Sequence, residues 1–443
     1  MISKTLKKII GLFEDNKSSD IKKEINEMHP GDVSQLINEL PSEYQSQAFK
    51  LLSSELASKV IYNLHDELRE EILENINQKR LVEIMDEMDS DEATDIAGEL
   101  DEHQLKDVLK KIDVEDSNEI KQLLVYDEES AGGIMQKEII AVQQEMNRTE
   151  MIEHIRANYE DVEKLYYIFV TDIRNKLIGI LEVSKLLLCK AEQKAKDIMN
   201  TEVIVAPVDM DREEVAGIFR KYDIYNLPVV DKDNRLLGRI TVDDIIDVID
   251  EEASEDVYRM VGLESEDKVF TSPLNSVRKR LPWLALNLVT AFLVSSVVGI
   301  FEVTIARLSF LAVLMPIVAG LGGNSGTQTL TVITRGIALG ELTLHNTYKA
   351  IFKEITVGII NGILIGSIAV IVAYLLKRNI LLGVVLGISM VCNMFIAGLI
   401  GSSIPVIMKS LKIDPALASS VIITMLTDMG GFASFLGLAT LLL

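Results

Sequence analysis

Several residue types are scarce in this 443-residue chain, and each scarcity removes a class of protein. Only two cysteines are present, Cys189 in a polar half and Cys392 in an apolar half, so neither a disulfide framework nor an oxidising compartment is indicated. The histidines are scattered singly, at His29, His65, His103, His154 and His345. Neither a P-loop nor a nucleophile elbow is found. We therefore do not expect an enzyme, and we interpret each histidine as structural or solvent-exposed.

Basic residues are also scarce, but unevenly along the chain. The net charge is −23, from 44 basic and 67 acidic side chains. Residues 281–443 contain only eight basic and five acidic side chains, so the first 280 residues carry −26. A field of that sign repels nucleic acid and concentrates cations, and we expect no nucleic-acid partner. A merely solubilising surface is the alternative that composition leaves open.

Long apolar runs are missing from the first 130 residues. Apolar residues recur there at three- and four-residue spacing, as in 33–40, and short helices are expected after proline-containing junctions such as 29–32 and 40–43. The expected short helices recur at roughly even intervals along the sequence. We predict an all-α superhelical domain over 1–130, followed by a hinge at 130–133.

An internal repeat lies within residues 136–254. Each copy reads as strand, polar turn, strand and helix, and Gly179 and Gly238 occupy equivalent places 59 positions apart. A duplicated α/β unit of this length resembles a tandem pair of CBS modules, which we assign to 131–254. Modules of that family often bind adenine nucleotides.

The two copies differ where such modules contact nucleotide. In the second copy Thr241 and Asp244 fit the family's pattern, whereas the first copy has Ser184 and Lys185 and lacks the carboxylate. Two interpretations stay open: ATP bound at the CBS pair, or a purely structural strand-to-helix turn.

The last part of the chain is apolar enough to be embedded in a membrane. Each of five segments is near or above the roughly 20 residues needed to cross it, and a globular alternative would need several long helices that are apolar all round. The predicted spans are about 282–301, 308–339, 349–376, 380–408 and 415–443. We therefore predict a five-helix transmembrane domain over 282–443, surrounded by lipid, and a connecting helix or helices over 255–281.

Basic residues between the spans predict the orientation. They gather at 278–280, 335–353 and 409–412, which share one side, and fewer lie on the other. Residues 1–16 hold only a short apolar patch and do not resemble a signal peptide. We expect a multi-pass protein of the cell membrane with its N-terminus in the cytoplasm.

Asp428 is the acidic residue that lies well inside an apolar span. An ionisable group at membrane depth is costly, which favours a place on an ion pathway. The alternative is a carboxylate that is paired with a basic group or kept protonated for packing. Thr424 lies one turn earlier on the same face and could join Asp428 in a polar ring.

Span two contains Pro316 and the glycine-rich segment 320–329. We interpret it as a broken helix whose carbonyls and Asn324 line a pore, because non-helical backbone at this depth must face protein or water. Close helix packing through small residues is the alternative.

Carboxylates in the first 280 residues form a second candidate system. Asp91 and Asp95 share one helical face, and a dense acidic run extends from Asp243 to Asp256. Like charges four residues apart destabilise a helix, and bridging divalent ions would relieve the repulsion. A solvated acidic face is the bland alternative.

Magnesium chemistry explains why few charges would suffice in a pore. Mg²⁺ is small, prefers six oxygens and gives up its waters reluctantly. A pore can therefore hold it hydrated, with a carboxylate and some carbonyls around the outer layer, and still release it.

Taken together, these features make the whole chain resemble the MgtE family of Mg²⁺ channels. The order of a helical N domain, a CBS pair, a connecting "plug" helix and five spans matches, as do the stretches 322–329 and 427–432. The resemblance implies a homodimer with the pore between the two chains. It implies pore contacts at Asp428 and Thr424, with Gly323, Asn324 and Thr327 lining the pore.

The resemblance also implies cytoplasmic Mg²⁺ sites that link the N domain, the CBS pair and the plug helix. By motif position they fall on Asp91, Asp95, Asp211, Glu213, Asp223, Asp244, Asp247, Glu252, Glu255 and Asp256. The implied mechanism is feedback, in which high cytoplasmic Mg²⁺ bridges the acidic faces and shuts the pore. Two rival functions stay open: a coupled transporter of another divalent ion such as Co²⁺ or Zn²⁺, and a non-conducting, membrane-tethered adenine-nucleotide sensor.

Overall fold

The chain divides into two units, Met1–Asp250 and Glu251–Leu443, which we call the first unit and the membrane unit and describe separately. The computed structural model describes residues 2–158, 165–263, 267, 269, 271–343, 345–417 and 420–443.

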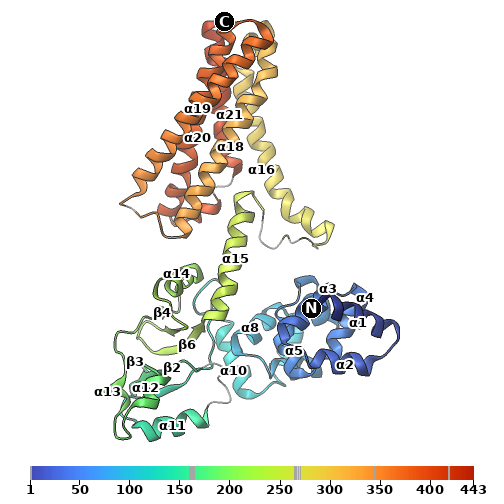
Figure 1. Cartoon of the computed structure of the whole chain (residues 1–443), viewed down its shortest axis with the longest axis vertical. Coiled ribbons are helices and arrows are strands. Elements are labelled where there is room, and N and C mark those ends of the chain that lie inside the picture. The colour runs from blue at the N-terminus through green and yellow to red at the C-terminus, as the bar shows by residue number, and fades with distance from the viewer. Residues whose placement is uncertain are drawn as a thin grey trace. The chain divides into compact units, whose positions relative to one another are not determined.

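The first unit begins with short helices, as predicted (Figure 1). Local sequence starts them: Pro30 occupies the first turn of its helix, and Ser53 accepts a hydrogen bond from Leu56 N at 3.3 Å. The helices are α1 Ile2–Glu14, α2 Ser18–Asn26, α3 Pro30–Glu39, α4 Ser42–Lys50, α5 Ser54–Ile61, α6 Asp66–Asn75, α7 Gln78–Met85, α8 Ser90–Glu99, α9 Glu102–Val108 and α10 Val114–Leu123.

Repeated asparagine contacts stack these helices. Asn26 donates from Nδ2 to Leu51 O at 3.1 Å and accepts from Ser53 N at 2.7 Å. Asn38 makes the same pair of bonds one helix later. A single buried apolar core runs through the stack, with Leu36, Ile61 and other aliphatic side chains fully buried. The superhelix of helix pairs is therefore confirmed.

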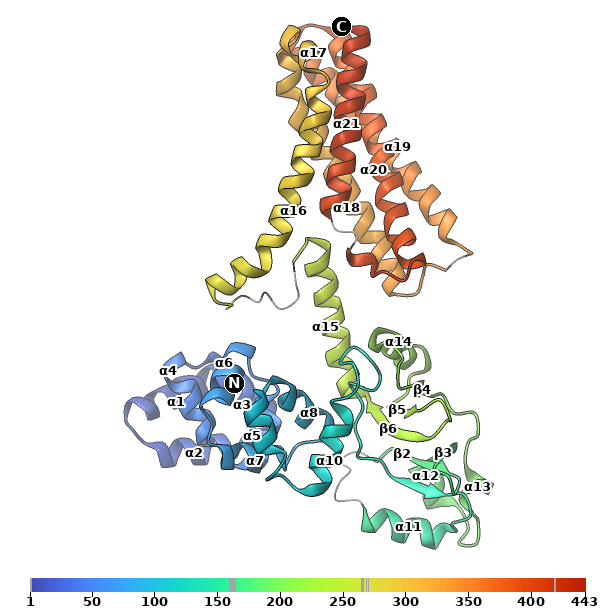
Figure 2. The same ribbon diagram turned by 180° about the vertical axis from the view of Figure 1, so that it is seen from behind.

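The duplicated α/β unit follows, and its two copies fold alike (Figure 2). Each contains a three-stranded sheet in which the first two strands are parallel and the last two antiparallel. The strands are β1 Ala141–Gln143, β2 Tyr167–Thr171, β3 Leu177–Glu182, β4 Ala206–Pro207, β5 Asn226–Val230 and β6 Leu236–Thr241. The helices are α11 Arg148–Ala157, α12 Val183–Leu188, α13 Ala195–Ile198, α14 Arg212–Tyr222 and α15 Val242–Met260.

Equivalent turn residues join the two copies. Asn175 and Asn234 both have φ of 60°, a conformation that asparagine tolerates better than most residues. Asn175 Nδ2 donates to Leu236 O at 3.1 Å, and Asn234 Nδ2 donates to Leu177 O at 2.8 Å. These reciprocal bonds relate the copies by an approximate twofold and confirm the predicted repeat.

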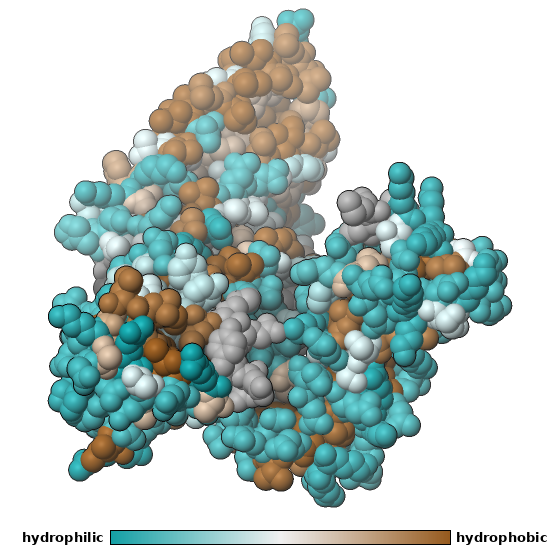
Figure 3. Space-filling view, turned by 60° about the horizontal axis from the view of Figure 1, so that its bottom comes forward, coloured by the Kyte–Doolittle hydropathy of each residue, from teal (hydrophilic) through white to brown (hydrophobic). Residues whose placement is uncertain are grey.

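The membrane unit contains five helices that are long and apolar enough to cross a membrane, counted among the described residues. They are α16 Pro273–Gly299, α18 Phe310–Ala338, α19 Thr347–Lys377, α20 Ile380–Ser410 and α21 Ser420–Leu442. A short helix α17 (Glu302–Arg307) and a 3₁₀ turn (Pro415–Leu417) lie between them. In Figure 3 the surface of this unit is largely hydrophobic and that of the first unit largely hydrophilic.

Glycines set the close packing of α19 against α20. Gly358, Gly362 and Gly366 recur every four residues, and a Cβ atom added at Gly366 would lie 2.8 Å from Gly387 O. At Gly362 it would lie 2.7 Å from Val391 Cα. Small residues at this spacing let two membrane helices approach closely and improve their van der Waals contact.

Two expectations were wrong in detail. Span two is not broken, because α18 is one continuous helix in which Gly322 and Gly326 pack against α20 and α21. A continuous helix keeps its backbone bonded in an apolar medium, so the small-residue interpretation applies. The bounds of the connecting segment also differ: α15 extends to Met260 across the expected boundary at 254–255, and α16 begins at Pro273, before the expected first span at 282.

Candidate functional site

Among the described residues of the membrane unit, one carboxylate has a buried oxygen without a hydrogen-bond partner. Asp428 lies in α21, and its Oδ1 is buried without a hydrogen-bond partner. None of the ion pairs among the described residues includes it. Packing between membrane helices does not require a carboxylate, because apolar groups pack there at lower cost. An unpaired carboxylate inside a membrane helix therefore favours a functional role. The alternative of a basic partner therefore finds no support in the described part of the chain.

Helices α18 and α21 meet beside this carboxylate. A Cβ atom added at Gly323 would lie 3.5 Å from Thr424 Cγ2, and one at Gly326 would lie 2.5 Å from Ile423 Cγ2. Thr427 donates from Oγ1 to Thr424 O at 3.0 Å. The predicted residues Gly323 and Thr424 are thus neighbours, one turn from Asp428.

The other predicted lining residues are placed less clearly. Asn324 is exposed on the single chain, and Thr327 is half-buried. Both lie on the stretch of α18 that contacts α21, but no described contact joins either of them to Asp428.

Sequence reasoning missed two buried polar residues in this unit. Glu354 of α19 is 4% exposed, accepts a bond from Thr329 Oγ1 at 3.3 Å, and pairs with Lys353 at 2.5 Å. Asn393 of α20 is 0% exposed. The signal was available in both cases, since each is a polar side chain inside a predicted span.

In the first unit, two predicted carboxylates approach one another from different domains. Asp91 of α8 is 7% exposed, and its Oδ1 is buried without a partner. Burial raises the pKa of Asp91 well above its usual value, and the negative charge of Asp244 raises it further. The structure therefore brings one residue of the helical domain and one of the second CBS copy into electrostatic contact.

Asp244 is held by its own turn. Its Oδ2 accepts from Thr241 Oγ1 at 2.5 Å, from Thr241 N at 3.2 Å and from Gln136 Nε2 at 3.3 Å. Burial raises the pKa of Asp244 to about 6, although the Thr241 bonds act in the opposite direction. This carboxyl belongs at once to the candidate nucleotide motif and to the candidate ion site.

Further carboxylates gather nearby that the sequence did not single out. Glu138 accepts from both Ser90 N and Ser90 Oγ at 2.8 Å, so it ties the CBS pair to α8. Burial, followed by the charge of Glu138, raises the pKa of Glu119 to about 7. Burial and then the charge of Asp86 raise the pKa of Asp116 to about 6. Among the described residues, however, no group of three or more His, Cys, Asp or Glu is arranged to hold a metal ion.

Two other predicted ion ligands of the first unit, Asp211 and Asp223, lie at opposite ends of one helix. Asp211 accepts from Glu213 N at 2.8 Å at the start of α14, and Asp223 ends the same helix with φ of 51°. Eleven helical residues separate the two ends by roughly 16 Å. The two ends of α14 are therefore too far apart to hold one ion between them. Asp95 and Asp247 are exposed on α8 and α15.

The predicted ligands of the membrane unit gather around an arginine. Arg259 pairs with Glu255, and it pairs with Asp414 at 2.5 Å. Burial raises the pKa of Asp256, and the charges of Asp414 and Glu252 raise it further. Asp414, which sequence reasoning did not select, is therefore part of this group.

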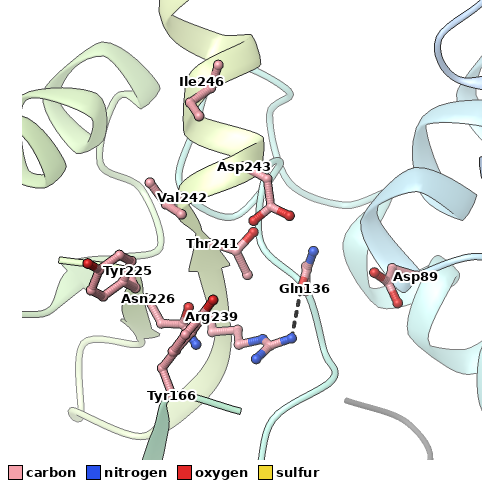
Figure 4. A pocket seen from close by; sticks show the side chains of 10 residues that line it. All are labelled: Asp89, Gln136, Tyr166, Tyr225, Asn226, Arg239, Thr241, Val242, Asp243 and Ile246. Carbon is pink, nitrogen blue, oxygen red and sulfur yellow. Dashed lines mark hydrogen bonds between the residues drawn. The ribbon is translucent and has the colours of Figure 1, made fainter. Parts of the chain in front are cut away.

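A cavity of about 170 Å³ opens beside the Thr241 turn (Figure 4). The rings of Tyr166 and Tyr225, equivalent residues of the two copies, are stacked with centroids 5.2 Å apart. Arg239 is 5% exposed, donates to Gln136 Oε1 at 3.2 Å, and keeps its Nε buried without a partner. The lining residues are Asp89, Gln136, Tyr166, Tyr225, Asn226, Arg239, Thr241, Val242, Asp243 and Ile246.

The first copy has a matching cavity of about 180 Å³. There Glu182 stands where the second copy has Thr241, and Lys185 stands where it has Asp244. The two cavities share Asn226, whose buried Nδ2 has no partner. The fold therefore offers two related hollows with different chemistry.

Five membrane-crossing helices joined to a helical domain and a CBS pair define a multi-pass membrane transporter with a large acidic domain outside the membrane. Family models agree: residues 315–438 match a divalent cation transporter, 28–129 the MgtE intracellular N domain, and 195–251 a CBS domain. The chain belongs to the MgtE family.

Individual relatives support this placement. The chain is 35% identical over 327 residues to "Magnesium transporter MgtE" of Thermus thermophilus, which covers 73% of this chain and 72% of the relative. It is 36% identical to the protein of the same name from Enterococcus faecalis, covering 74% and 72%. These relatives are transporters and not enzymes.

Two solved structures resemble the part outside the membrane. The soluble part of a magnesium transporter is 27% identical, with a TM-score of 0.51, covering 57% of this chain and 100% of that one. The cytosolic domain of the Mg²⁺ channel MgtE, solved in complex with ATP, is 32% identical with a TM-score of 0.51, covering 54% and 99%.

Proposed function

We propose that this protein is a channel that lets Mg²⁺ cross the cell membrane along a path beside Asp428. The observation that carries the proposal is the buried Oδ1 of Asp428, which has no partner among the described residues. An uncompensated carboxylate inside a membrane helix is stabilised when a cation passes or rests beside it. The names of the Thermus and Enterococcus relatives favour Mg²⁺ as that cation.

The ion crosses with water attached. The Asp428 carboxylate attracts the hydrated ion, and the Thr424 carbonyl together with Gly323, Asn324 and Thr327 contributes oxygens or space at the same level. Outer-sphere contacts of this kind bind weakly enough for the ion to leave again.

The pore forms between two copies of the chain. Each copy supplies the Asp428 carboxylate, so two copies supply two, which match the charge of a divalent ion. Closed twofold symmetry is the commonest arrangement of soluble homo-oligomers. With the basic residues at 278–280 on the inner side, the N-terminus lies in the cytoplasm.

Cytoplasmic Mg²⁺ shuts the pore by bridging carboxylates of different domains. Asp91 and Asp244 support this proposal, since Asp91 is buried and the negative charge of Asp244 raises the pKa of Asp91 further. Bridging also involves Asp95, Asp211, Glu213, Asp223 and Asp247 of the first unit and Glu252, Glu255 and Asp256 of the membrane unit. When Mg²⁺ is scarce, repulsion separates the acidic faces, because an ion shifts an equilibrium only by its preference for one state.

The cavity beside Thr241 binds an adenine nucleotide. Two stacked tyrosines offer an aromatic surface to a base, and the partnerless Nε of Arg239 offers a donor to an anionic group. Thr241 and Asp244 supply a hydroxyl and a carboxylate for the sugar or phosphate. The ATP in the related cytosolic domain favours ATP as the ligand.

The test is Mg²⁺ uptake into liposomes that contain the purified protein, with Mg²⁺ titrated on the cytoplasmic face. We expect uptake down the Mg²⁺ gradient alone, and its loss as cytoplasmic Mg²⁺ rises. Uptake that required a proton or sodium gradient would favour a coupled transporter, and no uptake of any divalent ion would favour the nucleotide sensor.

A further inference from the structure

A fully buried amide lies at the junction of three membrane helices. Asn393 of α20 is 0% exposed and donates from Nδ2 to Val318 O of α18 at 2.8 Å. Its Oδ1 is also buried and has no partner. A polar side chain in an apolar interior is costly unless something compensates for it, and here only half of the amide is bonded.

Two glycines from different helices make room for this amide. A Cβ atom added at Gly431 of α21 would lie 2.6 Å from Asn393 Nδ2, and one at Gly322 of α18 would overlap the same nitrogen. Real Cβ atoms do not approach that closely. The amide therefore fills the space that side chains at both positions would otherwise occupy, and it separates α18 from α21.

The same two glycines adjoin the residues proposed to contact the ion. Gly322 precedes Gly323, which faces Thr424, and Gly431 follows Asp428 by three residues on the same face of α21. Any change in the spacing held by Asn393 therefore moves Thr424 and Asp428 relative to α18.

We propose that Asn393 is a positioning residue that sets the ion selectivity of the pore. It does not touch the ion, and it acts by fixing the distance between α18 and α21. This inference rests on the proposed function. Mg²⁺ and Ca²⁺ differ in size and in how readily they lose water, so the width of a pore for hydrated ions discriminates between them.

The chain offers a matched set of variants. Asn393→Ala removes both the bond and the bulk, and Asn393→Asp keeps the shape but loses the donor. Asn361→Ala is the control, because Asn361 is an exposed asparagine on the neighbouring helix α19. Gly431→Ala tests the contact between Asn393 and α21 from the side of α21, alone and combined with Asn393→Ala.

The experiment measures Mg²⁺ and Ca²⁺ uptake into liposomes for each variant, normalised to folded protein by size-exclusion chromatography. We expect Asn393→Ala and Asn393→Asp to lower the Mg²⁺/Ca²⁺ uptake ratio by roughly tenfold, with Asn361→Ala unchanged. Gly431→Ala should lose transport because its Cβ meets the amide, and Asn393→Ala should restore part of that transport by removing the obstacle.

The outcomes separate the two proposals. Lower uptake of both ions at an unchanged ratio in both Asn393 variants would show a merely structural residue and overturn this inference. If Asn393→Ala does not fold, the ratio in Asn393→Asp decides. If adding Asn393→Ala does not restore transport to the Gly431→Ala variant, this would also count against the proposed spacing role of Asn393. Absence of Mg²⁺ uptake by the unmodified chain would instead overturn the proposed function.

Discussion

Acidic side chains are used in opposite ways by the two units. The first unit has many, and it gathers some of them where the helical domain meets the CBS pair, so that Asp91, Asp244 and Glu119 all have raised pKa values. The membrane unit has few, and one of them, Asp428, has a buried oxygen with no partner.

This contrast matches the two proposed roles, Mg²⁺ sensing in the first unit and Mg²⁺ conduction in the membrane unit. Crowded carboxylates outside the membrane store repulsion that a bound cation relieves, so they suit a switch whose state depends on ion concentration. A solitary carboxylate at membrane depth attracts a cation without holding it in a cage, so it suits passage. Under the proposed function, the same chemical group serves two tasks because its neighbours differ.

The largest expected effect comes from exchanging an acid of the membrane helices, Asp428, for its amide, with Glu354 as the comparison. Asp428→Asn should lower Mg²⁺ uptake by roughly 100-fold, equivalent to about 2.7 kcal/mol of lost attraction. Glu354→Gln should stay within a few-fold of the unmodified chain, because Glu354 is already paired with Lys353. Uptake by liposomes measures both. Similar losses in the two variants would mean that Asp428 is not special.

The switch is tested by removing carboxylates from α15. Asp244→Ala combined with Asp247→Ala should keep uptake running at high cytoplasmic Mg²⁺ and raise the half-closing concentration by about tenfold. Asp233→Ala, in an exposed turn of the same module, is the control. Normal shut-off in the double variant would exclude these two ligands.

The two CBS copies provide a smaller contrast. Thr241→Val should weaken ATP binding by about tenfold, or 1.4 kcal/mol, because a hydroxyl that faces the nucleotide is lost. Glu182→Ala, at the equivalent place in the first copy, should leave the affinity within a factor of about two. Isothermal titration calorimetry on the purified protein measures both, and equal losses would place the nucleotide elsewhere.

The smallest expected effect is on stability as the pH changes without Mg²⁺. The pKa of Glu119 is about 7 in the folded state, above its usual value of 4.5, so the folded state binds the extra proton. Stability from this group is therefore present at low pH and is lost as the pH rises from about 5 to 8. Solvent screening limits the contribution of Glu119 to the free energy of unfolding to on the order of 1 kcal/mol, or roughly 3 °C in melting temperature.

Glu119→Gln is the variant that isolates this group. Its melting temperature in EDTA should change less between pH 5 and pH 8 than that of the unmodified chain, because the amide does not titrate. An unaltered pH dependence would assign the effect to Asp116 or to other carboxylates of the cluster.

Much of the fold could be predicted from local sequence, and the exceptions have physical causes. The CBS repeat was visible because equivalent residues, such as Gly179 and Gly238, recur at a fixed separation and pair with equivalent strand residues. The continuity of α18 was not, because glycine breaks helices in water but promotes close packing between helices in a membrane.

The site divides in the same way. Asp428 could be predicted because its isolation in an apolar span is a local property of the sequence. The contact of Glu138 with Ser90 could not, because it joins residues 48 positions apart in different domains. Asn393 stands out in the sequence as a polar residue inside an apolar span, but its contacts with Gly322 and Gly431 of other helices could not be predicted.

The most direct test of the central claim is whether water reaches position 428. Cys189 and Cys392 are first replaced by serine. Asp428→Cys in that background is then treated with a water-soluble thiol reagent. Ala439→Cys is the control, because Ala439 is fully buried in the same helix. The account predicts that the cysteine at 428 reacts, because water lines its side of the helix, while the control stays unmodified. An unreactive thiol at 428 in folded protein would contradict it.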